Sequence, residues 1–173
     1  MVEFELENYK DPLVLSTSGT DSKINMYRID IGRREVQIIQ TSVGKGMATS
    51  VVPLNNQYFA ATSTSEIEFF DALTGMSVNS VQTSQLSPNS TYYGLDTLLT
   101  LAVIHQQQDT TKRYLAASGT SKIIYVFKVD LLLKCASIMV TQINTQHLNT
   151  IANLSFIRGF DHHYLVSASI DRH

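Results

Sequence analysis

The stretch Ser18–Asp30, with the sequence SGTDSKINMYRID, decides the fold because it recurs one hundred residues later. The second copy is Ser118–Asp130, SGTSKIIYVFKVD, which has the same length, opens on Ser-Gly-Thr and closes on Asp. A looser copy, ATSTSEIEFFDALTG, spans Ala61–Gly75, and YLVSASIDRH at Tyr164–His173 begins another. Recurrence at such spacings predicts an array of one supersecondary unit.

Short alternating runs separated by turn signals surround these copies. Lys23 to Ile29 alternates between apolar and polar residues, Asp30 to Arg33 reads as a turn, and Glu35 to Gln40 resumes the strand pattern. Strands of about five to seven residues joined by such turns predict an all-β protein built from antiparallel hairpins. The apolar stretch Val129–Met139 also fits a short helix, although its place between two β-rich runs favours a turn and a strand.

Composition restricts the possible function classes. Hydrophobic residues make up 43% of the chain, charged residues make up 16%, and the formal net charge is −2. A general nucleic-acid or membrane-surface binder is expected to be more basic. The single Cys135 cannot form an internal disulfide, and the N-terminal ten residues are polar and acidic, unlike a signal peptide. We therefore expect an intracellular protein of the cytoplasm or nucleus, with no membrane partner.

The second copy carries the residues that point to a family. Phe70-Asp71 followed by Thr74-Gly75 resembles the Trp-Asp-x-x-Thr-Gly ending of a WD40 β-propeller blade. Tyr27 and Phe127 take the aromatic position in the copies on either side. The family also carries an Asp six residues before that aromatic, and Asp21 fits by spacing while Asp171 fits by register. The resemblance implies blades of four antiparallel strands, with these aromatic side chains buried against the neighbouring sheet.

The family motifs are degenerate in this chain. It contains no Trp, and the Gly-His pair that often precedes the first strand of a blade is absent throughout. We therefore expect that the Asp-His-Ser-Trp hydrogen-bond network of many WD40 blades does not form. The blades should be held by strand ladders and aliphatic packing between sheets.

The repeat also predicts the domain organisation. Residues 1–173 are expected to form one partial WD40-like β-propeller, with blades at about 1–41, 47–82, 98–142 and an incomplete one at 150–173. Propellers close with about 4–8 blades. We therefore expect these sheets to be part of a larger ring, completed either by a longer form of this chain or by another chain.

No stretch carries a convincing catalytic, metal or cofactor motif. Gly44-Lys45-Gly46 lacks the flanking residues of a phosphate-binding loop and is interpreted as a connection between blades. His162 and His163 are neighbours on a strand and point to opposite faces, which disfavours a shared metal ion. No Ser, His and Asp are arranged by spacing for nucleophilic catalysis. Cys135 is expected to be a small core side chain.

These observations favour a non-catalytic scaffold or adaptor subunit of an intracellular multiprotein complex, whose partners are other proteins of a stable complex. The alternative is a propeller subunit of a ribonucleoprotein or chromatin assembly, and an enzyme comes third. Partner contacts are expected on the face formed by second-to-third-strand turns and blade connections. The candidate residues on that face are Asp21, Lys23, Lys45, Tyr92, Tyr93, Gln146 and His147.

Overall fold

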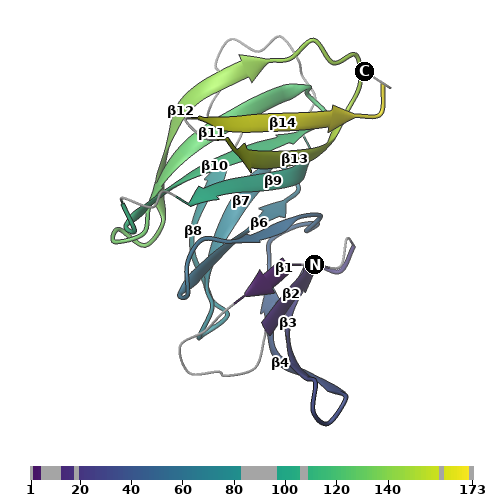
Figure 1. The fold of residues 1–173 in the computed structure, drawn as a ribbon, viewed down its shortest axis with the longest axis vertical. Coiled ribbons are helices and arrows are strands. Elements are labelled where there is room, and N and C mark those ends of the chain that lie inside the picture. The colour runs from purple at the N-terminus through teal and green to yellow at the C-terminus, as the bar shows by residue number, and fades with distance from the viewer. Residues whose placement is uncertain are drawn as a thin grey trace.

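The computed structural model describes residues 2–4, 13–17, 20–82, 97–105, 109–159 and 162–171, and these residues form only strands, turns and connections (Figure 1). The first sheet contains β1 (Val2–Phe4), β2 (Leu13–Thr17), β3 (Lys23–Asp30) and β4 (Glu35–Val43). The second contains β5 (Val51–Pro53), β6 (Tyr58–Ser63), β7 (Glu66–Asp71) and β8 (Ser77–Gln82). The third contains β9 (Leu98–His105), β10 (Lys112–Gly119), β11 (Ile123–Asp130) and β12 (Ala136–Asn144), and the fourth contains β13 (Ile151–Arg158) and β14 (His163–Ser169).

Every sheet is an antiparallel meander in which strands pair in the order of the chain. The second-to-third-strand turns and the connections between sheets therefore lie at one end of the sheets, and the other turns lie at the opposite end. The expectation of an all-β protein with four-stranded antiparallel sheets is confirmed. This is the architecture of successive β-propeller blades.

An aspartate closes the third strand of each four-stranded sheet and caps the turn that follows. The carboxylates of Asp30, Asp71 and Asp130 each accept backbone N–H groups from residues two or three positions later, at 2.8–3.4 Å. A residue with a left-handed backbone conformation then precedes the fourth strand of each sheet. For example, φ is near 57° at Arg34 and 71° at Gly75. The Asp that ends both copies of the long repeat is thus a turn-forming residue.

The aromatic of the repeat marks a β-bulge. The pairing of the third and fourth strands shifts immediately before Tyr27, Phe70 and Phe127 in their respective sheets. The structure therefore places these three residues at the same point of the unit. Phe70 and Phe127 are fully buried, and Phe70 stacks on Phe59 with ring centroids 5.1 Å apart.

The core consists of three apolar layers between successive sheets. The layer between the first and second sheets includes Ile24, Met26 and Phe70, and the layer between the second and third includes Phe69 and Phe127. The third layer is smaller and contains Ala102, Ala116, Ile124, Ile151 and Leu154. The first strands of neighbouring sheets contact each other, so the sheets are packed side by side along their inner strands.

The stretch Val129–Met139 contains no helix. β11 ends at Asp130, a turn covers residues 131–135, and β12 begins at Ala136, as the strand interpretation predicts. Cys135 is fully buried in the layer between the second and third sheets, and this burial raises the pKa of its thiol to about 12. The prediction of a core cysteine is confirmed, because a thiol with such a pKa is not a reactive thiolate near neutral pH.

Candidate functional site

The connection between β12 and β13 carries two of the candidate residues, Gln146 and His147. Its first residue, Thr145, donates a hydroxyl hydrogen bond to the carbonyl of Lys122, 2.7 Å away in the β10–β11 turn. The next residue, Gln146, is exposed, whereas only 13% of the His147 side chain is accessible. The connection is thus fixed to the third sheet and directs the imidazole inwards.

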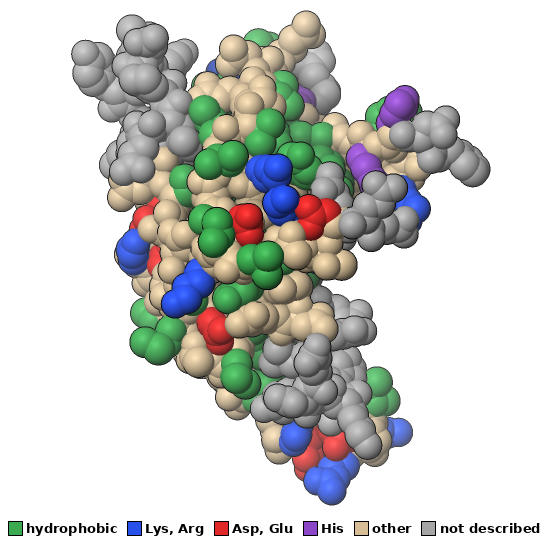
Figure 2. All heavy atoms as spheres, turned by 90° about the vertical axis from the view of Figure 1, so that its left-hand side faces the viewer, with side chains coloured by type: hydrophobic (Ala, Val, Ile, Leu, Met, Phe, Trp, Pro, Cys, Tyr) green, Lys and Arg blue, Asp and Glu red, His purple; other side chains and the backbone are tan. Residues whose placement is uncertain are grey.

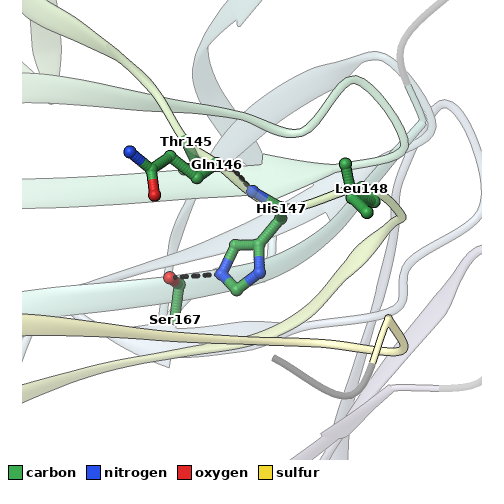
Figure 3. Close-up of a pocket in the computed structure, with 5 residues that line it drawn as sticks. All are labelled: Thr145, Gln146, His147, Leu148 and Ser167. Atoms are coloured by element: carbon green, nitrogen blue, oxygen red, sulfur yellow. Dashed lines mark hydrogen bonds between the residues drawn. The ribbon is translucent and has the colours of Figure 1, made fainter.

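The His147 ring lies between two residues of the fourth sheet. Its Nε2 atom is 2.9 Å from Ser167 Oγ on β14 (Figure 3), and its Nδ1 atom is 3.3 Å from Asp171 Oδ2. The same Asp171 oxygen accepts the backbone N–H of Leu148 at 2.6 Å. The Asp171 side chain is only 4% accessible. We call these four residues the fourth-sheet network.

In the neutral form of His147, the contacts determine which ring nitrogen carries the proton. A carboxylate accepts but cannot donate, so the proton on Nδ1 points to Asp171. Nε2 then accepts the hydroxyl proton of Ser167. The network therefore joins the β12–β13 connection to both β14 and the turn that follows it.

The Asp-His-Ser-Trp network was not expected because its His was not recognised, but at this sheet the Asp-His-Ser part is present, without a Trp. His147 takes the histidine position although Gln146, and not Gly, precedes it. In the sequence, Ser167 and Asp171 align with the repeat. The feature that was not recognised is a histidine about twenty residues before Ser167. The structure brings Ser167, His147 and Asp171 into contact in that order, which the sequence spacing did not indicate. That the chain has no set for nucleophilic catalysis stays a prediction.

The second and third sheets fix their connections with threonine instead. The backbone N–H of Met47 donates to Thr64 Oγ1 at 3.1 Å, and that of Thr97 donates to Thr120 Oγ1 at 3.1 Å. Thr64 and Thr120 lie in second-to-third-strand turns, as Asp171 lies in the turn after β14. In all three sheets, a side-chain oxygen of this turn accepts a backbone N–H that precedes the inner strand.

A pocket of about 610 Å³ lies beside the fourth-sheet network. It is lined by Thr145, Gln146, His147, Leu148 and Ser167 (Figure 3). Leu148 is 71% exposed, so the lining combines an exposed apolar side chain with polar atoms of His147 and Ser167. It is suited to a group that combines an apolar body with a hydrogen-bonding atom.

Asp21 lies in the β2–β3 turn, and Lys23 is the first residue of β3. Asp21 Oδ1 accepts the backbone N–H of Lys23 at 3.1 Å, and the two charged groups are 4.0 Å apart. About half of each side chain is accessible, so the pair both shapes the turn and remains available to a partner. Their role in binding stays a prediction.

Lys45 lies in the connection between the first and second sheets, as its interpretation as a link between blades predicts. Its backbone N–H donates to Glu68 Oε1 at 2.6 Å, and its Nζ lies 3.4 Å from Glu66 Oε2 and 3.1 Å from Ser80 Oγ. Glu66 and Glu68 are buried, at 8% and 1% exposure. These contacts anchor the connection through both backbone and side chain, and no pattern in the sequence indicated them.

The other three candidates are Gln146, Tyr92 and Tyr93. Gln146 is exposed beside the pocket, and Tyr92 and Tyr93 lie outside the described residues. Among the residues that the structure describes, no group of three or more His, Cys, Asp or Glu could hold a metal ion. No helix in the described part of the chain is long and apolar enough to cross a membrane.

Comparison with solved structures finds many chains with a similar fold. In all, 423 chains of solved structures match it, so the fold does not identify one function. One is a chain of the "Crystal Structure of Mitotic Checkpoint Complex", with a TM-score of 0.60 and 13% sequence identity over 94% of this chain. The match covers 43% of that chain, so this protein spans less than half of its length. At this identity the likeness shows the fold alone.

Sequence comparisons add no family. No family model matches the chain. No curated protein matches it either.

Proposed function

We propose that this chain is a divergent WD40-type propeller portion that serves as a non-catalytic scaffold or adaptor in an intracellular complex. Residues 1–173 act as one unit of blades, and further polypeptide completes the ring. The partners are other proteins, which bind the end of the sheets where the connections and the second-to-third-strand turns meet.

The observation that carries this proposal is a hydrogen bond that recurs in successive sheets. It joins a side chain in the turn after the second strand to a backbone N–H group of the connection before the first strand. Thr64, Thr120 and Asp171 each hold a connection at the same end of successive sheets. Loops that are fixed before binding lose less conformational freedom when a partner docks. A row of such loops is therefore suited to protein recognition.

The surface chemistry favours protein partners over nucleic acid. Figure 2 looks onto the outer strands, where hydrophobic side chains lie among both Lys or Arg and Asp or Glu side chains. The formal net charge of −2 also provides no excess of cations for phosphate groups. Binding of the isolated protein to RNA that weakens steeply with added salt would instead favour the ribonucleoprotein alternative.

The test is affinity purification of the tagged protein, with variants at the two ends of the sheets. We expect Asp21→Ala, Lys23→Ala and Gln146→Ala, combined in one chain, to lower the recovery of partners by about fivefold or more. The matched control combines Arg33→Ala and Lys112→Ala, which lie at the opposite end and should change recovery little. Equal losses in both variants would overturn the assigned surface, and the absence of any stoichiometric partner would overturn the scaffold function.

A second candidate, serine-hydrolase chemistry, is favoured by the order of contacts from Ser167 through His147 to Asp171. The same Asp171 oxygen also fixes the Leu148 backbone, a structural task that threonine performs in the second and third sheets. We therefore favour the structural role. Covalent labelling of Ser167 by a fluorophosphonate, lost in His147→Gln, would establish the hydrolase instead.

A further inference from the structure

The interface between the first and second sheets contains two buried acidic side chains, Glu66 and Glu68. Ala61 pairs with Glu68 and belongs to the apolar layer between these sheets, so Glu68 points to the first sheet. Glu66 and its partner Ser63 lie two positions away along the same two strands and share this side. The exposed fractions of Ser63, Glu66 and Glu68 are 4%, 8% and 1%. Charge in such a place destabilises the closed interface unless a cation or hydrogen bonds balance it.

Three buried polar atoms of this interface lack a hydrogen-bond partner. They are Gln40 Nε2, Ser63 Oγ and Glu68 Oε2, and no other buried side-chain nitrogen or oxygen atom of the described residues is in this state. Gln40 pairs with Met26 on β3, whose side chain lies in the same apolar layer. A buried polar atom without a partner raises the free energy of the closed state. Closure of the first sheet on the second therefore depends on the contacts that offset this cost.

The interface between the second and third sheets holds its buried charge differently. Arg113 is 7% exposed and lies on the same side of β10 as Leu115, which belongs to the layer between these sheets. Its Nε atom donates to the carbonyl of Leu54 at 2.7 Å, across the interface. Its Nη1 atom lies 2.7–3.2 Å from the carbonyl oxygens of residues 109, 110 and 112. The charge of this interface is thus distributed over hydrogen bonds to both sheets, and no unpartnered atom lies there among the described residues.

Lys45 supplies the positive charge at the interface between the first and second sheets. Its Nζ atom is 3.4 Å from Glu66 Oε2 and 3.1 Å from Ser80 Oγ, and Ser80 pairs with Glu68. Its backbone N–H donates to Glu68 Oε1 at 2.6 Å. Within the described part of the chain, Glu66 and Glu68 form no other ion pair. The Lys45 side chain is 59% accessible, so one exposed amine balances two buried carboxylates.

The connection approaches the second sheet closely on both sides of Lys45. A Cβ atom on Gly44 would lie 3.1 Å from Glu68 Oε1, and one on Gly46 would lie 2.5 Å from Thr64 Oγ1. Glycine at both positions therefore lets the connection run along the second sheet, with the backbone N–H of Lys45 against Glu68. This backbone path keeps the Lys45 amine beside the two carboxylates.

We propose that Lys45 acts as a charge-dependent latch that keeps the first sheet closed on the second. The latch consists of Lys45, Glu66 and Glu68. With the amine charged, the two carboxylates are balanced and the unpartnered atoms stay enclosed. Loss of this single charge, by substitution or by acylation of the amine, leaves two buried carboxylates without a cation, and the first sheet then opens as a unit.

The latch controls part of the proposed partner surface. Asp21 and Lys23 belong to the first sheet and the turn before its third strand, whereas Gln146 lies in the connection after the third sheet. Opening of the first sheet moves Asp21 and Lys23 away from the connections of the other sheets, so a partner that contacts both loses part of its site. This consequence rests on the proposed scaffold function, whereas the latch itself does not.

The test is amide hydrogen exchange of the natural protein with two substitutions at one position. Lys45→Gln removes the charge, whereas Lys45→Arg keeps it, and both retain the backbone N–H. We expect Lys45→Gln to accelerate exchange in β1 to β4 by about tenfold or more and to leave β9 to β12 within about twofold. Lys45→Arg should stay within about threefold of the parent protein throughout.

The carboxylates provide a second arm of the test. In a protein that carries Glu66→Gln and Glu68→Gln, no buried charge requires Lys45, so Lys45→Gln should accelerate exchange in β1 to β4 by less than about twofold. Equal effects of Lys45→Gln and Lys45→Arg, or acceleration that persists in this background, would overturn the latch. Uniform acceleration across all sheets would do the same, because it indicates a general loss of stability.

Recovery of partners separates the latch from the scaffold function. We expect Lys45→Gln to lower the recovery and Lys45→Arg to preserve it. An open first sheet with undiminished recovery would overturn the role of the latch in binding and leave the scaffold function intact. An absence of partners even for the parent protein would overturn the scaffold function, while the exchange result would still decide the latch.

Discussion

The second and fourth sheets hold their connections by different chemistry. In the second sheet, Thr62 Oγ1 accepts the backbone N–H groups of Thr49 and Ser50 at 2.9 and 3.0 Å, and Thr64 accepts that of Met47. We call these residues the second-sheet network. In the fourth sheet, a carboxylate, an imidazole and a hydroxyl act on the equivalent connection.

The surroundings of the two networks also differ. Thr62 is completely buried, and Thr49 also donates to the backbone of Leu98 and Leu99 in the next sheet. Compact hydroxyls fit this closed space at Thr49 and Ser50, whereas the buried carboxylate of Glu68 accepts the backbone N–H of Lys45 earlier in the same connection. In the fourth-sheet network the Asp171 carboxylate is only 4% accessible, and the Leu148 N–H and His147 contact it, while His147 and Ser167 line an open pocket. The repeat therefore determines which backbone N–H groups of the connection need an acceptor, while the side chain that accepts them differs from sheet to sheet.

The largest expected effect comes from Gly119, the last residue of β10, directly before the corresponding turn of the third sheet. A Cβ atom at this position would overlap the carbonyl of Thr97, whose N–H group bonds to Thr120. Gly119→Ala should lower the free energy of unfolding by about 3 kcal/mol or more in chemical denaturation. Gly32→Ala is the control, because its Cβ would meet only Asp30 Oδ1 at 3.4 Å. Equal losses in the two variants would contradict the close approach.

The second-largest effect is expected from removing the carboxylate of the fourth-sheet network, and it should be confined to the fourth sheet. Asp171→Ala removes the acceptor of both Leu148 and His147, which should cost about 2–3 kcal/mol. Amide hydrogen exchange should become faster at Leu148 and in β13 and β14 and remain unchanged in β5 to β8. Asp171→Asn retains an oxygen acceptor and should lose less. Uniform acceleration across all sheets would show that this network does not act locally.

Thr62→Val tests the second-sheet network with a side chain of similar shape. The backbone N–H groups of Thr49 and Ser50 lose their buried acceptor, so the free energy of unfolding should fall by about 1–2 kcal/mol. Thr141→Val, on an exposed position of β12, should change it by less than about 0.5 kcal/mol. An unchanged midpoint for Thr62→Val would mean that packing alone holds the connection.

The smallest effect concerns Asp71 and pH. Burial alone would raise its pKa, but hydrogen bonds from Thr74 and Leu73 outweigh burial and hold the pKa of Asp71 below its usual value. A carboxyl whose pKa is lower in the folded state stabilises the fold above its unfolded pKa of about 4, and this contribution is lost as the pH falls further. In Asp71→Asn, the decrease in stability between about pH 5 and 2 should be shallower by about 1 kcal/mol or less. Identical pH profiles would show that these bonds do not favour the ionised form.

Features of the fold could be predicted from the sequence where the interacting residues lie only a few positions apart. The Asp that closes each third strand, the aromatic at the bulge and the turn at Asp21 all act on residues within a few positions. The contacts of Lys45 with Glu66 and Glu68 join residues more than twenty positions apart and leave no periodic pattern. His147 was missed as a network residue because the family pattern required a preceding glycine, whereas the geometry requires only the imidazole.

The most direct test of the scaffold function is native mass spectrometry of the tagged protein isolated from cells that express it naturally. We expect a particle in which the tagged chain is joined by at least one other polypeptide at fixed stoichiometry. Recovery of a monomer with only the 19.3 kDa calculated for residues 1–173 plus the tag would contradict it.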